Sequence, residues 1–134
     1  MPAYPNAKTI SFAPLFLVAF GCAVSLAAQT TEELPTAFDA GWQGEEVCEL
    51  LYENDDMRVG RCTFPPEIGH ERHFHPPHWG YILEGSTMRI TDADGTEERR
   101  LESGVSWWSD GVDWHEAVNI GTETGVYLIV EPKS

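Results

Sequence analysis

Short runs rich in β-branched and aromatic residues fill the chain after residue 46, and turn residues separate them. Gly, Pro, Asn and Asp occupy the breaks, and the Asp94-Gly95 pair between two runs is typical of a hairpin. No window of about 12 residues after residue 44 carries a helical stripe. The pattern predicts an all-β fold of short antiparallel strands, closed as a sandwich or barrel. The runs cover residues 47–52, 57–64, 79–84, 86–91, 96–102, 105–108, 115–120 and 125–131.

The N-terminus follows a different pattern. Residues 10–28 form an uncharged apolar run that follows Lys8 and ends in small residues. This is the pattern of a secretory signal peptide, so we expect residues 1–28 to be cleaved and the mature chain to be exported, to a periplasm or outside the cell. An uncleaved membrane anchor and a lipid anchor on Cys22 are the alternatives.

Residues 29–45 are polar and contain Pro and Gly. They predict an extended segment with little regular structure, which leaves residues 46–134 as one domain. Acidic residues number 22 and basic residues 8 in the whole chain, and the formal net charge is −14. Such a charge disfavours nucleic acid and anionic membrane surfaces, because both need clustered Lys and Arg. We therefore expect no nucleic-acid partner and, after cleavage, no stable membrane association.

Two cysteines remain once the N-terminal run is removed. Cys48 and Cys62 are equally distant from Asp55, so a hairpin centred on Asp55 would place them opposite each other. Export would put them in an oxidising compartment. A cross-strand disulfide and two buried free thiols both remain open at this point.

The histidines are the strongest candidates in this chain for the ligands of a functional site. There are five, and four of them lie within the nine residues 70–78. His73 and His75 are two apart, so in a strand both imidazoles point to one face, and neutral imidazole is the commonest transition-metal ligand in proteins. His70 is off this spacing, and we expect it to be a hydrogen-bonded or exposed side chain rather than a ligand. In the next strand, alternation places His78 and Ile82 on the inner face.

Other side chains near the histidines are weaker candidates for a role in a functional site. Most of the aromatic residues there are expected to pack between the sheets, with one or two lining a pocket. Arg89 either faces inward, where it could bind a substrate carboxylate, or faces outward and pairs with Glu97 or Glu98. Glu71 and Glu116 are expected to point away from the histidines, so neither is predicted to be a general base. The aromatic residues concerned are Trp79, Tyr81, Trp107, Trp108 and Trp114.

Taken together, these residues resemble the two motifs of the cupins, and the match extends over roughly residues 46–132. The first motif is G(X)5HXH(X)3,4E(X)6G, in which His73 and His75 stand at the two histidines and Gly85 at the closing glycine. The second is G(X)5PXG(X)2H(X)3N, and it matches Gly104, His115 and Asn119. The chain is similar to a small single-domain cupin of the cupin-2 type.

The sequence departs from these motifs at several positions. His78 stands where the family has its metal-binding glutamate, and Glu67 stands at the opening glycine of the first motif. In the second motif, Asp110 replaces the proline and Val112 the second glycine, although Gly111 beside it can still make the turn. Among the ligand positions, the departure is the carboxylate, which is replaced by His78.

The resemblance implies a double-stranded β-helix, a jelly-roll barrel, that holds one divalent metal. Carried over by position, the ligands are His73, His75 and His115, with His78 either as the fourth ligand or turned away. The metal is a transition ion, Fe, Zn, Cu, Ni or Mn, and nitrogen donors without a carboxylate disfavour Mg and Ca. Such a site keeps a charge of +2 and attracts an anionic ligand. A metal-free barrel that only binds a small ligand is the alternative.

Two classes of function follow from the resemblance. One is a metal-dependent enzyme, oxygenase-like, that acts on a small acidic or enolisable substrate. The other is an exported module that binds a metal or a small ligand without turnover. No further catalytic motif distinguishes them, so the catalytic residues stay unknown. Metal affinity is expected to fall below about pH 6.5, where free imidazole takes up a proton, and a homodimer is compatible with the family.

Overall fold

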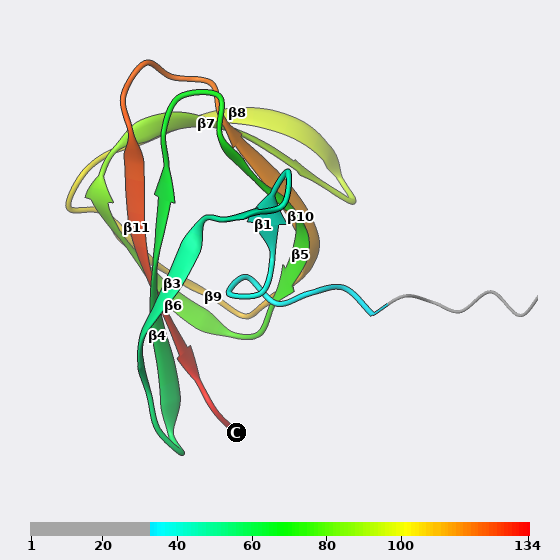
Figure 1. Ribbon diagram of the computed structural model, residues 1–134, viewed down its shortest axis with the longest axis vertical. Coiled ribbons are helices and arrows are strands. Elements are labelled where there is room, and N and C mark those ends of the chain that lie inside the picture. Colours follow the sequence, from blue (N-terminus) through cyan, green and yellow to red (C-terminus); the bar gives the residue numbers. More distant parts are fainter. Residues whose placement is uncertain (1–32) are drawn as a thin grey trace, which may run out of the picture. The chain divides into compact units, whose positions relative to one another are not determined.

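The computed structural model describes residues 33–134, so the predicted signal peptide lies outside the described residues. Residues 33–134 contain no helix that is long and apolar enough to cross a membrane. Every regular element in this part of the chain is a strand (Figure 1). The strands are β1 (Gly41–Trp42), β2 (Glu45–Glu46), β3 (Cys48–Glu53), β4 (Met57–Phe64), β5 (Gly69–His75), β6 (His78–Glu84), β7 (Ser86–Asp92), β8 (Gly95–Leu101), β9 (Ser106–Ser109), β10 (Val112–Asn119) and β11 (Gly125–Pro132).

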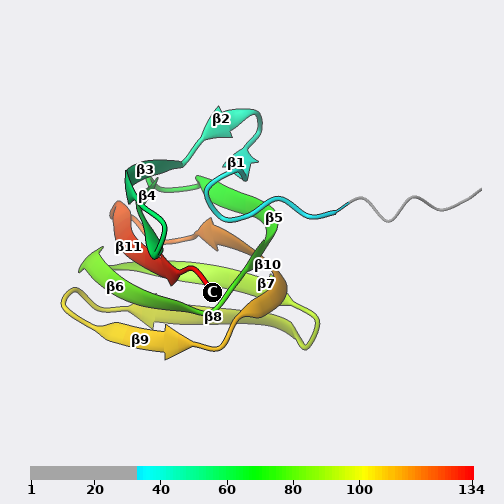
Figure 2. The same ribbon diagram turned by 90° about the horizontal axis from the view of Figure 1, so that it is seen from below.

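Two antiparallel sheets contain all the longer strands (Figures 1 and 2). One sheet has the order β3-β4-β11-β6-β9 and the other the order β5-β10-β7-β8. From β5 onward the chain passes repeatedly from one sheet to the other, so that strands adjacent in a sheet are mostly distant in sequence. This alternation is the jelly-roll arrangement, a double-stranded β-helix, and it confirms the predicted all-β fold.

The core lies between the two sheets. Phe64, Ile82 and Tyr127 reach it from the five-stranded sheet, and Met88 reaches it from the four-stranded sheet. Burial alternates along β6, where His78 and Ile82 are buried. The inner face predicted for this strand is therefore confirmed, and it points His78 toward the interior.

The aromatic residues near the histidines do not all pack as expected. Trp107 lies against the core and covers Gly80, where a side chain would collide with the indole ring. Trp79 and Trp108 are paired across β6 and β9 on the outer face, 38% and 56% exposed. The expectation that most of these rings fill the core was wrong for these two, because strand alternation places them opposite to the buried set.

The β3–β4 hairpin carries the two cysteines. Cys48 pairs with Cys62 in the ladder, and their sulfur atoms form a disulfide. The register holds from Cys48 to Leu50 and then shifts by one residue before Tyr52. Of the two states left open by the sequence, the structure has the cross-strand disulfide.

The polar segment before the barrel is more structured than its composition predicted. Its end forms the β1–β2 hairpin, with Gly44 in a left-handed turn at φ 89°. Upstream, Thr36 makes a parallel bridge to Phe74, and Phe38 fills the space beside Gly60, which has no room for a side chain. The segment thus packs on the barrel next to β5, the strand that carries most of the histidines.

Candidate metal centre

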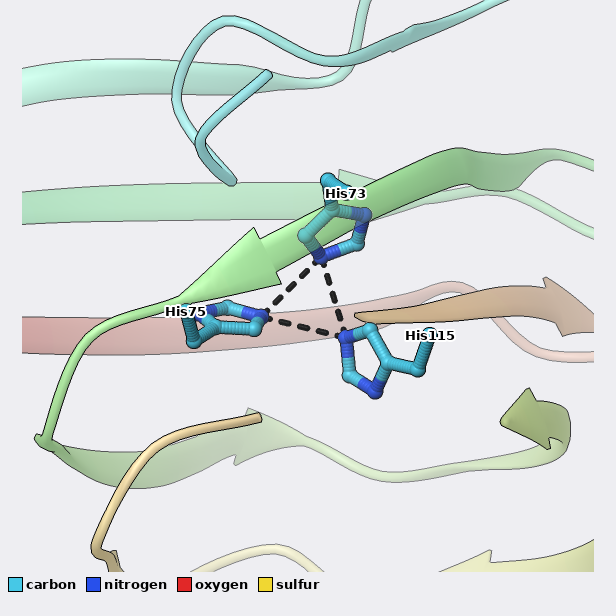
Figure 3. Close-up of side chains that lie close together, drawn as sticks. All are labelled: His73, His75 and His115. Atoms are coloured by element: carbon cyan, nitrogen blue, oxygen red, sulfur yellow. Dashed lines mark hydrogen bonds between the residues drawn. The ribbon is translucent and has the colours of Figure 1, made fainter. Parts of the chain in front are cut away.

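Three histidines from two neighbouring strands meet inside the barrel (Figure 3). His73 and His75 lie on β5, and His115 lies on β10 directly opposite His73. Opposite residues of an antiparallel pair project to the same face, so this register brings the rings together. Between Val112 and His115 the strand β10 has one residue more than β5, and the resulting bulge sets His115 opposite His73.

The spacing of the ring nitrogens suits one metal ion. The Nε2 atoms of His73 and His75 are 3.0 Å apart, those of His75 and His115 3.1 Å, and those of His115 and His73 3.0 Å. Zn–N bonds are about 2.0–2.1 Å long, and two such bonds at a right angle separate their nitrogens by about 3.0 Å. The three atoms could therefore occupy one face of a metal ion and leave its opposite face open.

The hydrogen bonding of His73 also fits a metal ligand. Its Nδ1 lies 2.6 Å from the carbonyl oxygen of Glu71. A carbonyl only accepts, so Nδ1 donates, and the Nε2 of the neutral ring is left with a lone pair. That lone pair points at the Nε2 atoms of His75 and His115 (Figure 3). A cation between the three nitrogens would satisfy it.

Burial keeps these rings in the form that binds metal. It lowers the pKa of His73 to about 2, with the neighbouring histidines His70 and His115 adding to the effect. It also lowers the pKa of His115 to about 3, again with help from nearby histidines. Both rings are therefore neutral at neutral pH, as metal binding requires.

His70 is buried, although regular alternation over three residues would place it on the face of the strand opposite to His73. Between His70 and His73, β5 has one residue more than β10, and this second bulge turns His70 to the inner face. Its Nε2 lies 2.9 Å from the carbonyl of Ala37, and its ring lies 3.7 Å from that of His73. Burial lowers the pKa of His70 to about 4. Of the two states expected for His70, hydrogen-bonded or exposed, the structure has the hydrogen-bonded one, and His70 lies outside the three-histidine group.

His78 lies beside the group without joining it. It is 3% exposed, its Nδ1 donates to the carbonyl of Pro76 at 2.9 Å, and its ring is 4.5 Å from that of His75. Burial lowers its pKa as well. This geometry corresponds to the arrangement in which His78 is turned away, and the four-histidine ligand set stays a prediction.

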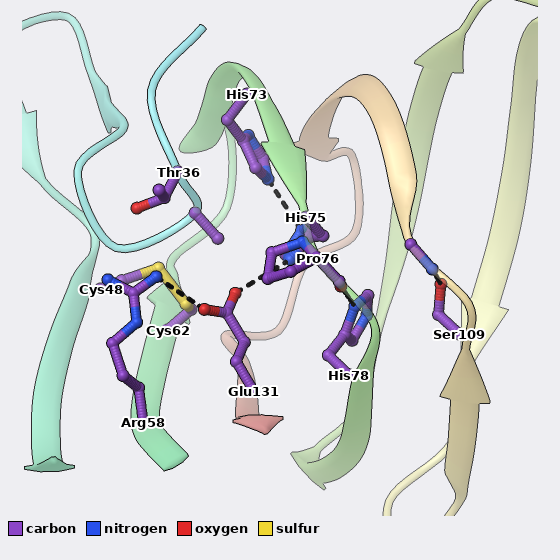
Figure 4. A network of polar contacts seen from close by, with 12 residues as sticks. Thr36, Cys48, Arg58, Cys62, His73, His75, Pro76, His78, Ser109 and Glu131 are labelled. Carbon is purple, nitrogen blue, oxygen red and sulfur yellow. Dashed lines mark hydrogen bonds and ion pairs between the residues drawn. A yellow bond between two sulfur atoms is a disulfide. The ribbon is translucent and has the colours of Figure 1, made fainter. Parts of the chain in front are cut away.

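Glu131 and Arg58 are residues near the site that the sequence analysis missed. Glu131 is 2% exposed and faces His75, while its other oxygen accepts from Arg58 at 2.7 Å (Figure 4). Strand alternation could have found it, because Tyr127, Ile129 and Glu131 share the inner face of β11. Burial raises the pKa of Glu131, but His75 and Arg58 outweigh this and leave the pKa below its usual value.

Other candidates from the sequence lie away from the centre. Arg89 is exposed and 3.6 Å from Glu98, so the outward alternative is confirmed. Glu71 is exposed and accepts a bond from the backbone of Gln43. Asn119 of the second motif is fully buried and structural, because its amide donates to the carbonyls of Phe64 and Glu123 at 2.7 Å.

Two surface clefts are formed by residues other than the three histidines. The larger, about 580 Å³, lies between the β1–β2 hairpin and the edge formed by β3 and β4, and the smaller, about 320 Å³, lies beside the turn after β6. The larger is lined by Trp42, Gln43, Glu45, Glu46, Val47, Cys48, Glu49, Arg61, Thr63, Pro65 and Ile68. The three histidines thus do not line either of these two clefts, and His115 is the least buried of the three.

Comparison with solved structures finds the same fold in other proteins. A cupin domain from Bordetella pertussis Tohama I is 18% identical, with a TM-score of 0.63, over 76% of this chain and 98% of that one. The polyketide cyclase RemF from Streptomyces resistomycificus is 25% identical, with a TM-score of 0.51, over 63% of each chain. A cupin superfamily protein from Desulfitobacterium hafniense DCB-2 is 14% identical, with a TM-score of 0.51, over 65% of this chain and 76% of that one.

Comparison by sequence gives the family. No curated protein sequence matches the chain. The family model described as Cupin domain matches residues 60–131, which is more than half of the chain and includes all five histidines. The resemblance inferred from the two motifs is thereby confirmed, and the chain belongs to the cupin family.

Proposed function

We propose that this cupin binds one divalent transition-metal ion through His73, His75 and His115 and acts as a metal-dependent enzyme on a small acidic or enolisable molecule. The observation that carries the proposal is the set of three Nε2 atoms at 3.0–3.1 Å from one another. When bound, such an ion supplies a Lewis acid for an anionic oxygen and, if it is iron or copper, the redox chemistry of an oxygenase.

The surrounding residues favour an anionic ligand at this centre. Imidazole nitrogens alone leave the full +2 charge of an ion in place, and this donor set suits Fe, Zn, Cu, Ni or Mn. His73 is 0% and His75 7% exposed, so water has little access to these two rings. Beside these two buried rings, although His115 is only half-buried, the attraction between a cation and a carboxylate or enolate is stronger than in bulk water.

One structural relative supports the enolisable class of substrate. RemF is a polyketide cyclase. Polyketide chains carry repeated carbonyl groups, and the carbon between two carbonyls loses a proton readily, so such compounds are enolisable. We therefore include 1,3-dicarbonyl compounds among the substrates to be tested.

A binding module without turnover is the second candidate function. It is favoured by the burial of His73 and His75, which are 0% and 7% exposed, and by the fact that neither of the two clefts is lined by a member of the group. Ligands held in this way could retain an ion without turnover. This candidate shares the metal site with the first and differs in the absence of a reaction.

The proposed function includes export of the mature chain. The Cys48–Cys62 disulfide supports export, because such bonds persist in oxidising compartments and are rare in reducing ones. A homodimer, compatible with the family, stays a prediction that light scattering on the purified chain tests.

The two candidate functions are separated by turnover. The chain, purified without a histidine tag, is loaded with Fe(II), Cu(II), Ni(II), Mn(II) or Zn(II) and mixed with carboxylic acids, 1,3-dicarbonyls and phenols. Substrate loss and oxygen uptake are followed, with His115→Ala as the matched control. The enzyme proposal expects metal-dependent turnover that the variant lacks. Stoichiometric metal with no turnover for any compound would instead establish the binding module.

A further inference from the structure

The imidazole of His75 has a carboxylate on the side away from the other two histidines. Its Nε2 faces His73 and His115, whereas its Nδ1 lies 3.8 Å from Oε1 of Glu131 (Figure 4). Both of these atoms are buried, and neither has a hydrogen-bond partner within residues 33–134. Two unsatisfied polar atoms that face each other in a protein interior are uncommon and indicate an interaction between them.

The 3.8 Å separation of Nδ1 and Oε1 favours direct contact between them. It exceeds the usual N–H···O distance of about 2.7–3.2 Å. A water in contact with both atoms would have to lie to one side of the pair, at an angle narrower than its tetrahedral hydrogen bonding favours. A direct hydrogen bond, after a small movement of either side chain, is therefore the arrangement that satisfies both atoms best.

Arg58 determines which oxygen of Glu131 is free for this bond. Its Nη2 donates to Oε2 of Glu131 at 2.7 Å, and its guanidinium lies 4.9 Å from the centre of the Phe38 ring. Arg58 is thus held on two sides, and it fixes the carboxylate to which it donates. Oε1 is left as the acceptor that faces His75.

We propose that Glu131 is a positioning residue for His75. By accepting a hydrogen bond from Nδ1, it keeps the ring proton on that nitrogen and leaves Nε2 with the lone pair that the metal centre needs. A neutral imidazole has one N–H, and the partner of one nitrogen decides the state of the other. His73 receives the same orientation from the carbonyl of Glu71. The inference rests on the proposed metal site.

Glu131→Gln gives a sharp test because it changes one atom and leaves the shape unchanged. Arg58 can only donate, so it takes the amide oxygen and leaves the NH2 group facing His75. The Nδ1 of His75 must then accept, which moves its proton to Nε2, inside the centre. Glu98→Gln, an exposed glutamate paired with Arg89, is the matched control.

Two measurements read the effect. Nitrogen-15 NMR of the metal-free imidazoles at pH 8 reports which ring nitrogen of His75 carries the proton, with His73 as internal reference. Competition with a chelator reports the affinity for Zn(II). In the native chain we expect the proton of His75 on Nδ1. In Glu131→Gln we expect it on Nε2, together with a 10- to 100-fold loss of Zn(II) affinity, and in Glu98→Gln no change.

The outcomes separate this inference from the proposed function. If the native chain binds Zn(II) and Glu131→Gln binds it equally well with an unchanged His75 proton, Glu131 does not position His75 and the metal site stands. If the native chain binds no metal, the proposed function fails, while the proton position in His75 still decides the role of Glu131. If Glu131→Gln does not fold, the native spectrum decides, and a proton on Nε2 of His75 overturns the inference.

Discussion

His115 lies directly opposite His73 across the β5–β10 ladder, and the Nε2 atoms of the two rings are 3.0 Å apart. The two residues are 42 positions apart in the sequence, so only the folded sheet brings them together. The ladder also passes through both bulges of the site, one on each strand. The candidate centre is therefore a product of this one strand pairing, and changes to it test the whole account.

The role of His78 can be measured by removing its ring. Its Nδ1 donates to Pro76 and it lies outside the three-histidine group, so we expect His78→Gln to keep one metal ion per chain. Elemental analysis and chelator competition check this. An affinity loss of more than about 100-fold, as large as that of His115→Ala, would make His78 the fourth ligand.

The stability of the metal-free chain should decrease on acidification. The pKa values of His70, His73 and His115 are lowered to about 4, 2 and 3, from 6.5 in the unfolded chain. Below pH 6.5 the unfolded chain therefore binds protons that the folded chain does not. The free energy of unfolding should fall between pH 6.5 and about pH 4, by up to about 1.4 kcal/mol per pH unit for each histidine. Urea unfolding at pH 7.5, 6.5 and 5.5 measures it, and equal stability at all three would contradict the burial of neutral rings.

The Cys48–Cys62 disulfide should stabilise the barrel. It links residues 14 positions apart, and closing a loop of that length reduces the freedom of the unfolded chain by about 3 kcal/mol. Replacing both cysteines with alanine should lower the free energy of unfolding by about that amount, with the oxidised chain as control. Two reactive thiols in the denatured, non-reduced chain would show that the bond does not form.

Glu67 offers a stabilising substitution. It stands at the first-motif position of the family's glycine and has a φ of 69°, in the left-handed region. This conformation costs a residue with a side chain about 1 kcal/mol, whereas glycine adopts it freely but loses more entropy on folding. We expect Glu67→Gly to raise the free energy of unfolding by about 0.5 kcal/mol, and Glu67→Ala to bring no gain. A loss of stability in the glycine variant would contradict the proposed cost of the left-handed conformation at Glu67.

Strand alternation and motif spacing predicted much of this protein. The inner face of β6, the pairing of Cys48 with Cys62 and the convergence of His73, His75 and His115 all follow from periodicity or from the resemblance to cupins. Gly111, one residue before the motif's glycine, does supply a left-handed turn at φ 115°. These features depend on local order along the chain, which a sequence displays directly.

The remaining features depend on irregularities that periodicity does not reveal. A bulge in β5 buries His70, whose spacing from His73 predicted the opposite face. The pairing of Glu131 with Arg58 joins residues 73 positions apart, and no motif marks either of them. Burial also changes the expected pH dependence of metal affinity at two of the ligands, because it lowers the pKa of His115 to about 3 and that of His73 to about 2, well below the 6.5 of a free imidazole.

The central claim is that three imidazoles hold one ion, and metal content tests it most directly. The chain is purified without a histidine tag, exposed to excess Zn(II) or Fe(II), dialysed at pH 7.5 and assayed for metal by elemental analysis. We expect one ion per native chain and less than about 0.1 per chain in His73→Ala and His115→Ala, provided that both variants remain folded. A native chain without metal, or alanine variants that retain a full equivalent, would contradict the account.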